Sequence, residues 1–257
     1  MMAENKMDKS VSVKNITFRE GETRICVPLV GKSLEELQQR AQDLTDAGAD
    51  IIEWRVDHYT DVASPERVMQ ALQAIHQTLA PIPLIFTFRS KKEGGESELS
   101  DEAYFALNHL AASSGLVDII DIELFNDEMR IRKAVDAAHA TGVKVIMSSH
   151  DFVKTPAKEE IIHRLCRMQD LGADLPKIAV MPQCAEDVLR LLEATLTMNQ
   201  QHATRPVITM SMGKMGGVSR VTGGLFGSAM TFGTAGQVSA PGQIEIGKLR
   251  EMMSILS

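Results

Sequence analysis

The sequence predicts a single (β/α)8 barrel, and three observations support this fold class. The chain has 257 residues, which is a common length for one barrel domain. Eight short apolar runs begin 23 to 35 residues apart, which is the spacing of strand–helix units rather than of hairpins. Helix-like stretches separate these runs. Evenly repeated units of this kind favour a closed barrel over an open sheet with edge strands.

The eight apolar runs are the predicted strands. Most are continuously apolar, as expected for parallel strands that are covered on both faces. We predict strands at Arg24–Leu29, Ile51–Asp57, Leu84–Arg89, Ile119–Leu124, Lys144–Asp151, Leu175–Pro182, Pro206–Met212 and Ala229–Gly233.

The segments between the strands carry signals of helix starts and ends. Ser33 and Glu36 form a capping box for the first predicted helix. Ser64 and Thr155 each precede a proline, which indicates a hydroxyl cap followed by proline at the first helical position. Left-handed glycine caps are predicted at the helix ends at Gly48, Gly115, Gly142 and Gly172.

We expect one domain in this chain. No proline-rich or low-complexity linker divides it, and we place the single barrel domain at residues 11–257. Residues 1–10 are polar and lack the apolar core of a secretory signal, so we treat them as an N-terminal extension. No apolar run approaches the roughly 18 residues of a membrane span, so we expect no membrane partner.

Charge and cysteine usage limit the partners further. The net charge of −7 and the lack of any basic run of five or more residues argue against nucleic acid. Cys26, Cys166 and Cys184 lack metal-ligand spacing, and we expect reduced thiols in a cytoplasmic protein. No pair of histidines has zinc-like spacing with a supporting carboxylate. We therefore predict that the protein needs no metal and no cofactor.

The most informative residue is Lys177, which lies inside the otherwise apolar run Leu175–Pro182. Burial disfavours the charged form of an amine, and a neutral amine is a nucleophile towards ketones. This position favours a covalent nucleophile, and the alternative is a buried ion pair with Glu53 or Glu123. Lys214 is a rival amine, but its glycine-rich surroundings predict an exposed side chain.

Charged residues also gather at the downstream ends of the second and third strands. Glu53, Arg55 and Asp57 alternate along one face, which indicates either an ion-pair ladder or recognition of hydroxyls and a carboxylate. Arg89 ends the next strand and is placed to hold Glu53 or an anionic ligand in a forked pair. Glu93 follows near two glycines, where a solvated loop and a position over the barrel mouth are the alternatives.

Later strands end in further candidate residues. His150 ends the fifth strand beside Asp151, where an imidazole suits general acid–base work and a structural histidine is the alternative. Arg220 follows the seventh strand in a glycine-rich loop that is expected to bind an anion. Ser239 and Gln243 lie in the aperiodic segment after the eighth strand, which is either a lid that adds hydrogen bonds or an ordinary surface loop.

Together these motifs resemble those of type I 3-dehydroquinases. The matching segments occur in the family's order and span nearly all of residues 20–257. They are Glu53–Asp57, Phe86–Arg89 with Glu93–Glu96, Ser149–Phe152, Pro176–Ala179, Ser219–Arg220 and Ser239–Gln243. The resemblance implies a homodimeric, metal-independent barrel lyase. Such an enzyme dehydrates 3-dehydroquinate to 3-dehydroshikimate in the shikimate pathway of aromatic amino acid biosynthesis.

The resemblance also implies roles for individual residues. Lys177 matches the Schiff-base lysine, His150 the general acid and base of a syn elimination, and Glu93 a carboxylate that supports the histidine. Two positions depart from the pattern, because Pro28 replaces a hydroxyl residue and Ser149 replaces an asparagine. The substrate contacts that the resemblance implies are Glu53, Trp54, Arg55, Arg89, Arg220, Ser239 and Gln243.

Two rival functions remain open from the sequence. A class I Schiff-base aldolase also carries a lysine on a sixth barrel strand, but it needs a phosphate cradle and a base that cleaves a C–C bond. A non-catalytic binding barrel is the second rival. Candidate polar groups at five different strand ends argue against it.

Overall fold

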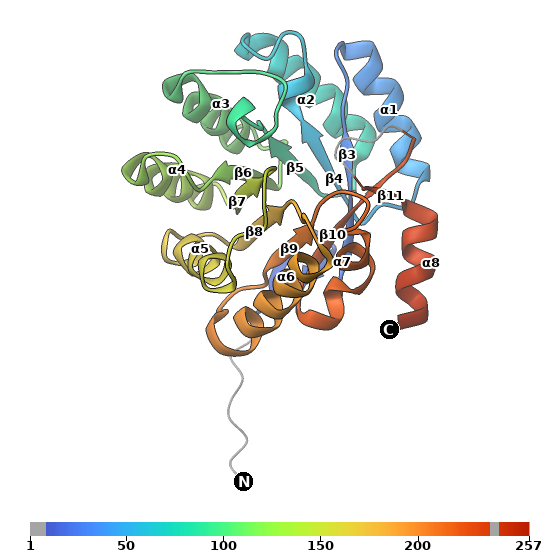
Figure 1. The fold of residues 1–257 in the computed structure, drawn as a ribbon. Coiled ribbons are helices and arrows are strands. Elements are labelled where there is room, and N and C mark those ends of the chain that lie inside the picture. Colours follow the sequence, from blue (N-terminus) through green and yellow to red (C-terminus); the bar gives the residue numbers. More distant parts are fainter. Residues whose placement is uncertain (1–8, 237–241, 257) are drawn as a thin grey trace.

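Eight parallel strands form the wall of a barrel in this computed structural model, and helices cover the wall from outside (Figure 1). The strands are β3 (Arg24–Leu29), β4 (Ile51–Arg55), β5 (Leu84–Thr87), β6 (Ile119–Glu123), β7 (Lys144–Asp151), β8 (Leu175–Val180), β9 (Ile208–Ser211) and β10 (Met230–Thr234). The ladder runs in chain order from β3 to β9, with β10 beside β3. A parallel bridge between Val207 and Ser228 closes the ring. The predicted (β/α)8 barrel is confirmed.

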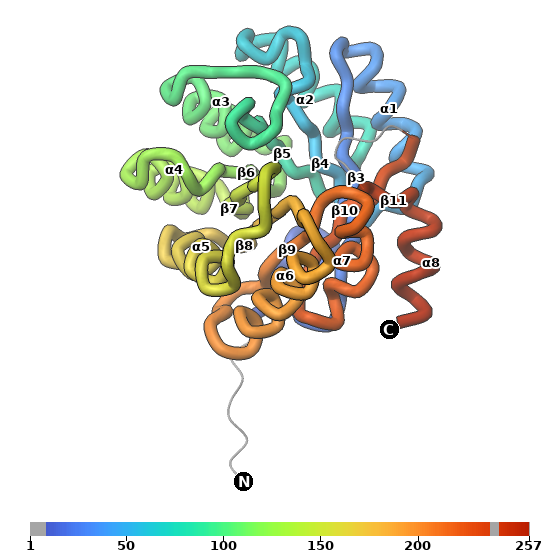
Figure 2. The backbone as a smooth tube through the Cα atoms, in the orientation of Figure 1, coloured from blue at the N-terminus to red at the C-terminus, as the bar shows by residue number. Residues whose placement is uncertain are grey.

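Helices alternate with the barrel strands along the chain. Figure 2 traces this order from the blue N-terminal end to the red C-terminal end. They are α1 (Leu34–Asp46), α2 (Pro65–Leu79), α3 (Asp101–Ser113), α4 (Glu128–Ala140), α5 (Lys158–Asp170), α6 (Ala185–Thr197), α7 (Gly217–Thr222) and α8 (Ile246–Leu256). The short strand β11 (Ile244–Glu245) pairs with β10 just before α8. The structure describes residues 9–236 and 242–256. Over these residues, no helix is both long enough and apolar enough to cross a membrane.

Local capping explains where most helices begin and end. The hydroxyl oxygen of Ser33 accepts a hydrogen bond from the backbone N–H of Glu36, and that of Ser64 accepts from Arg67. Each bond satisfies an N–H that has no partner within the helix. The four glycines predicted at helix ends have φ between 73° and 93°, which costs little only for glycine.

One predicted cap is wrong. Helix α5 begins at Lys158 after Ala157, and the hydroxyl of Thr155 donates instead to the backbone carbonyl of Met181 at 3.1 Å. Five strands, β4, β5, β6, β8 and β9, also end one or two residues earlier than predicted. Strand β4 stops at Arg55, where the chain turns into a short 3-10 helix at Val56–His58, and β5 stops at Thr87. Tertiary contacts at the barrel mouth determine where these strands end. The apolar pattern of the sequence does not show such contacts.

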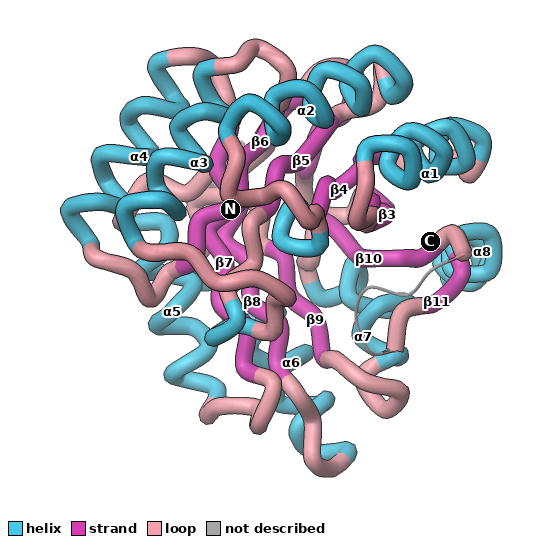
Figure 3. The backbone as a smooth tube through the Cα atoms, turned by 90° about the horizontal axis from the view of Figure 1, so that it is seen from above, coloured by secondary structure: helices cyan, strands magenta, loops and turns pink. Residues whose placement is uncertain are grey.

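Alternation along each strand divides the core into two layers. Outward side chains such as Ile52 and Trp54 pack between the wall and the helices. Inward side chains at the strand starts, such as Ile51, Ile85 and Ile119, fill the barrel itself. Figure 3 shows the strands enclosed by the helices. The apolar inner layer occupies the amino end of the barrel and leaves the carboxyl end for polar groups.

A hairpin that the sequence analysis did not assign plugs the amino end. Strands β1 (Val11–Val13) and β2 (Ile16–Phe18) pair antiparallel through a turn at Lys14, whose φ is 48°. Phe18 is fully buried in the inner apolar layer. Two strands of three residues are too short to show a clear alternation in the sequence, which is why the pattern missed them.

Candidate active site

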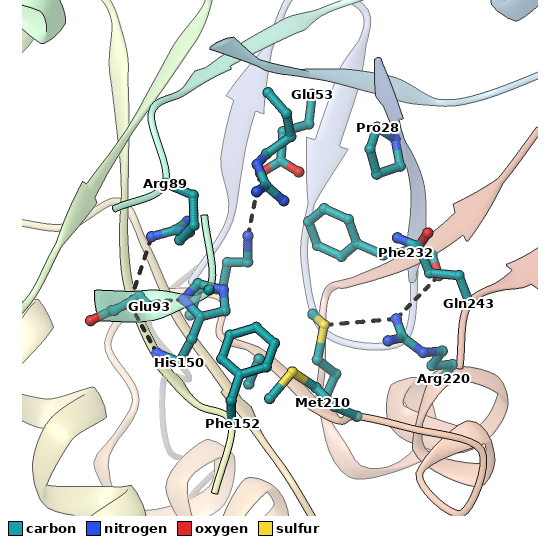
Figure 4. Close-up of a pocket in the computed structure, with 15 residues that line it drawn as sticks. Pro28, Glu53, Arg89, Glu93, His150, Phe152, Met210, Arg220, Phe232 and Gln243 are labelled. Atoms are coloured by element: carbon teal, nitrogen blue, oxygen red, sulfur yellow. Dashed lines mark hydrogen bonds and ion pairs between the residues drawn. The ribbon is translucent and has the colours of Figure 1, made fainter. Parts of the chain in front are cut away.

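A cavity of about 130 Å³ opens at the carboxyl ends of the barrel strands (Figure 4). Drug-sized ligands occupy pockets of roughly 300–1,000 Å³, so this cavity suits a smaller molecule. Pro28 forms part of its wall. Eight of the predicted site residues also line it, namely Glu53, Arg55, Arg89, Glu93, His150, Lys177, Arg220 and Gln243.

Lys177 points into this cavity from β8, because the next residue, Ile178, takes the outward position against the helices. Its side chain is almost fully buried. Nζ lies 3.5 Å from Oε1 of Glu53 and 3.6 Å from Oδ2 of Asp121. The ring centre of Phe232 lies 4.4 Å away. The expectation of purely apolar surroundings is therefore wrong, because two carboxylates lie beside this nitrogen.

His150 and Glu93 form a hydrogen-bonded pair at the cavity wall (Figure 4). Nδ1 of His150 lies 2.9 Å from Oε2 of Glu93, and the backbone N–H of His150 donates to the same oxygen at 3.0 Å. The solvated loop considered for Glu93 is wrong, because its side chain is only 8% exposed. Gly94 has a φ of 83° and leaves room for the ring of Phe152, which stacks against His150.

Burial controls the protonation of this pair. It raises the pKa of Glu93 to about 8 with help from nearby carboxylates, although Arg89 acts in the opposite direction. Burial, followed by the positive charges of Arg89 and Lys177, holds the pKa of His150 well below its usual value. The two groups share their titration. Once the pair has lost its proton, Nδ1–H donates to the carboxylate and Nε2 is free to act as a base.

Arg89 connects the carboxylates beneath the cavity. Its guanidinium lies 2.8 Å from Oδ1 of Asp121 and 2.9 Å from Oε1 of Glu123. Of the two alternatives for Arg89, the forked pair with Glu53 is not found among the described residues, because β6 offers two carboxylates at bonding distance. The other alternative, an anionic ligand, stays a prediction. Because Glu123 binds Arg89, it is not the ion-pair partner of Lys177. Of the two ion-pair partners considered for Lys177, Glu53 is the one in contact, and this contact does not decide whether the amine is also a nucleophile.

The charged residues of β4 divide between two tasks. Arg55 donates two hydrogen bonds of 2.8 Å to the carboxylate of Asp57, which also accepts from the backbone N–H of Glu96. Asp57 lies beyond the end of the strand, so it ties down the loop that carries Glu93. Of the two alternatives predicted for this strand, the ion pair therefore describes Arg55 and Asp57. Glu53 faces the cavity and Lys177 instead.

Arg220 stands on the other side of the cavity (Figure 4). It lies in the short helix α7 rather than in a loop, because Ser219 at the helix start bonds the backbone of Ser211. Its guanidinium donates to the carbonyl of Phe232 at 3.3 Å and contacts the sulfur of Met210 at 3.8 Å. Burial lowers the pKa of Arg220 to about 10, so it remains charged at neutral pH. A buried guanidinium at a cavity wall can bind a carboxylate in a forked pair.

Trp54 does not reach the cavity, and the predicted substrate contact is wrong. Strand alternation places it on the face opposite Glu53 and Arg55. It is fully buried in the outer layer, where its ring makes edge contacts with Phe86 at 5.5 Å and Tyr59 at 6.1 Å. It supports the wall of the site from behind.

The neighbours of His150 in sequence do not orient its ring. Ser149 faces outward, and its hydroxyl accepts a hydrogen bond from Arg164 at 3.4 Å. The carboxylate of Asp151 accepts from backbone N–H groups of the following loop. The orienting partner is Glu93, which is 57 residues away in the chain. The departure at Ser149 therefore leaves the ring orientation intact.

Sequence reasoning missed several residues near the amine. Asp121 alternates with Glu123 on β6, as Glu53 does with Arg55 on β4, and this alternation was the available signal. Other missed side chains carry no such charge pattern; they are Thr87, Ser148, Phe152 and Phe232. Only the folded barrel brings them together.

The segment after β10 is described in part. Gln243 lines the cavity, whereas Ser239 lies outside the described residues. The choice between a lid and an ordinary loop therefore stays a prediction. Lys214 is exposed, as its surroundings predicted.

The fold and the site define a (β/α)8-barrel enzyme. Enzymes of this architecture place their catalytic groups at the carboxyl ends of the strands. Here one such cavity holds a buried amine, an imidazole hydrogen-bonded to a carboxylate, and a buried guanidinium. This set of groups suits acid–base chemistry on a small polar molecule.

The chain belongs to the type I 3-dehydroquinase family, whose model matches residues 25–257. It is 72% identical to a 3-dehydroquinate dehydratase from Klebsiella pneumoniae over 98% of this chain and 100% of that protein. A 3-dehydroquinate dehydratase from Bacillus licheniformis is 56% identical over 97% of this chain and 98% of that protein.

Solved structures agree with this assignment. A type I 3-dehydroquinate dehydratase from Clostridium difficile is 52% identical, with a TM-score of 0.94 over 97% of this chain and 98% of that one. The enzyme from Geobacillus kaustophilus is 36% identical, with a TM-score of 0.94 over 96% of each chain.

Proposed function

We propose that this enzyme dehydrates 3-dehydroquinate to 3-dehydroshikimate through a Schiff base on Lys177. The family assignment and the names of the relatives support the reaction. The observation that carries the chemistry is one cavity lined by the Lys177 amine and by the imidazole of His150. The Clostridium difficile relative was solved with covalently modified comenic acid, and we extend covalent chemistry of this kind to Lys177.

The first step joins Lys177 to the ring ketone. The free amine attacks the carbonyl carbon, and loss of the carbonyl oxygen as water leaves a protonated imine. The amine transiently gives up a proton before attack, and Glu53 Oε1 at 3.5 Å is the nearest recorded acceptor. Overall, an ammonium group and a ketone give an iminium ion and water. The positive charge therefore stays beside the two carboxylates that already face it.

The second step removes a proton from the carbon beside the iminium. The cation withdraws the electron pair of the C–H bond, and Nε2 of His150 takes the proton while Nδ1–H remains bonded to Glu93. The product of this step is an enamine. Glu93 stabilises the imidazolium that forms, because a carboxylate at 2.9 Å offsets its charge.

The third step expels the β-hydroxyl group as water. Protonated His150 returns its proton to the leaving oxygen, and the enamine electrons restore the imine in conjugation with the new double bond. One residue can thus act as both base and acid, because a syn elimination has the proton and the leaving group on the same face of the ring. Water then hydrolyses the imine and frees the amine of Lys177. Arg220 holds the substrate carboxylate and fixes which face of the ring meets His150.

Steady-state assays test the reaction assigned here. Purified protein supplied with 3-dehydroquinate should produce a conjugated enone that absorbs in the ultraviolet. In the matched assay, a ketose phosphate tests the aldolase alternative and should give no cleavage. Turnover of the sugar phosphate without turnover of 3-dehydroquinate would overturn the proposal.

We also propose a cytoplasmic homodimer that serves the shikimate pathway, with residues 11–257 as one catalytic domain. The family resemblance supports the dimer, and the free thiols of Cys26, Cys166 and Cys184 suit a reducing compartment. Light scattering coupled to gel filtration should give twice the chain mass of 28.2 kDa. A mass equal to one chain at working concentration would contradict the dimer.

A further inference from the structure

Asp121 is a buried carboxylate beneath the floor of the cavity, on β6. Its Oδ1 is held twice, by the hydroxyl of Ser148 at 2.6 Å and by the guanidinium of Arg89 at 2.8 Å. Among the described residues, Oδ2 accepts no hydrogen bond, and Nζ of Lys177 lies 3.6 Å from it. One oxygen is therefore anchored while the other faces the amine.

The surroundings of Asp121 favour its ionised form. Burial raises the pKa of Asp121, but Arg89, Lys177 and the hydrogen bond from Ser148 more than reverse this effect, so the pKa lies below its usual value. A negative charge that water cannot reach acts strongly on a cation a few ångströms away. Asp121 does not line the cavity, so a bound substrate does not displace its contact with Lys177.

We infer that Asp121 is a positioning residue that acts through Lys177, holding Nζ at the cavity floor and keeping the imine protonated. This inference rests on the proposed function. An imine that loses its proton withdraws electrons poorly, so the adjacent C–H bond keeps its proton. Glu53 is also near Nζ, but it lines the cavity and is itself a proposed substrate contact. Asp121 is the counter-ion that remains in place throughout the cycle.

Other ionisable groups surround this pair and share its electrostatics. Lys177 also faces the imidazole of His150 and the thiol of Cys26, and Asp121 also faces the phenol of Tyr104. The remaining charged groups that face the pair from neighbouring elements are Glu53 on β4, Arg89 after β5, Glu93 in its short helix and Glu123 on β6.

The test is Asp121→Asn, which keeps the shape of the side chain and removes its charge. Removing a negative charge lowers the pKa of each neighbouring group. The base form of His150 and Glu93 then appears at lower pH, and the imine loses its proton at lower pH. A plot of kcat against pH rises on an acidic limb, as His150 and Glu93 lose their proton, and falls on a basic limb, as the imine loses its proton. Both limbs should therefore move towards lower pH, each by about one pH unit. At the optimum, kcat should fall about 10- to 100-fold, with little change in KM.

The matched control is Glu123→Gln, which removes a carboxylate from the same arginine. Glu123 binds Arg89 but has no recorded contact with Lys177. Its loss should move only the acidic limb, because that limb reports the pair formed by His150 and Glu93. A purely structural role for Asp121 would lower kcat without moving either limb, and this result would overturn the inference.

A second variant covers the case in which Asp121→Asn fails to fold. Ser148→Ala keeps the carboxylate and removes one of its two anchors. It should lower kcat several-fold with both limbs in place, and an unchanged kcat would overturn the inference. Borohydride trapping of the wild-type enzyme separates the two proposals. No adduct on Lys177 defeats the proposed function, whereas an adduct together with unmoved limbs in Asp121→Asn defeats only the role of Asp121.

Discussion

The two sides of the cavity differ in the groups that they present. On one side, which we call the lysine side, ion pairs link Glu53, Arg89, Glu93, Asp121, His150 and Lys177. On the other, the arginine side, Arg220 contacts the carbonyl of Phe232 and the sulfur of Met210. Linked charges hold groups in defined protonation states, whereas a buried guanidinium at a cavity wall can bind a carboxylate in a forked pair. The comparison teaches that the linked ionisable groups and the Arg220 guanidinium occupy separate walls, and we propose that chemistry and substrate anchoring are divided in the same way.

The largest effect is expected at the centre of the lysine side. Lys177→Met keeps the length of the side chain and removes its amine, so turnover should fall by on the order of 10⁴-fold or more. Kinetic assays with 3-dehydroquinate measure the loss. Lys214→Met is the matched control, because Lys214 is an exposed lysine of the same mouth region and should keep full activity. Comparable activity in Lys177→Met and Lys214→Met would contradict the central role that we give to Lys177 on the lysine side.

His150→Ala is expected to have the next largest effect. Loss of the acid and base should lower kcat by about 10²–10⁴-fold, while the amine of Lys177 still forms an imine. Rapid-mixing experiments can follow both steps separately. His163→Ala, on the exposed surface of α5, is the control and should behave like the wild type. Near-normal turnover in His150→Ala would remove this residue from the mechanism.

Arg220→Ala should affect binding more than chemistry. A hydrogen-bonded contact with a charged group contributes about 1.5–3 kcal/mol, so KM should rise about 10- to 100-fold. The expected change in kcat is smaller, because Arg220 does not touch the pair formed by His150 and Glu93. Initial-rate kinetics measure both constants. A variant with unchanged KM and reduced kcat would show that the two walls do not divide their tasks in this way.

The smallest expected effect is a change in how kcat depends on pH. Because burial raises the pKa of Glu93 to about 8, its pair with His150 keeps a proton below that pH, and kcat should rise as pH increases from 6 to 8. In Glu93→Gln the amide oxygen can still accept from Nδ1–H, but the titrating carboxyl group is gone. The rise near pH 8 should disappear, and kcat should fall about tenfold. An unaltered profile in this variant would place the titration elsewhere.

Much of the fold follows from local patterns in the sequence. All eight barrel strands lie within two residues of their predicted positions, because a buried parallel strand needs an apolar run whatever its neighbours are. The short hairpin at Val11–Phe18 was missed, and the cap at Thr155 was wrong, because both depend on distant partners. Strand periodicity alone should have excluded Trp54 from the cavity, since its neighbours Glu53 and Arg55 point inward.

The candidate site was less predictable than the fold. A charged residue inside an apolar run identified Lys177. Position at a strand end identified His150, since strand ends meet at the mouth of a barrel. It could not identify the partners, because contacts such as Lys177 with Asp121 and His150 with Glu93 cross 56 and 57 residues of chain. The expected apolar setting of Lys177 failed for this reason. A single strand shows that a lysine is buried but not which carboxylates it meets.

Borohydride trapping followed by peptide mass spectrometry tests the central claim most directly. The enzyme is mixed with 3-dehydroquinate, reduced and digested, and the modified peptide is mapped. We predict one reduced adduct, on the peptide that holds Lys177, and none in Lys177→Met. An adduct on another lysine such as Lys214, or full turnover by an enzyme that never yields an adduct, would contradict the account.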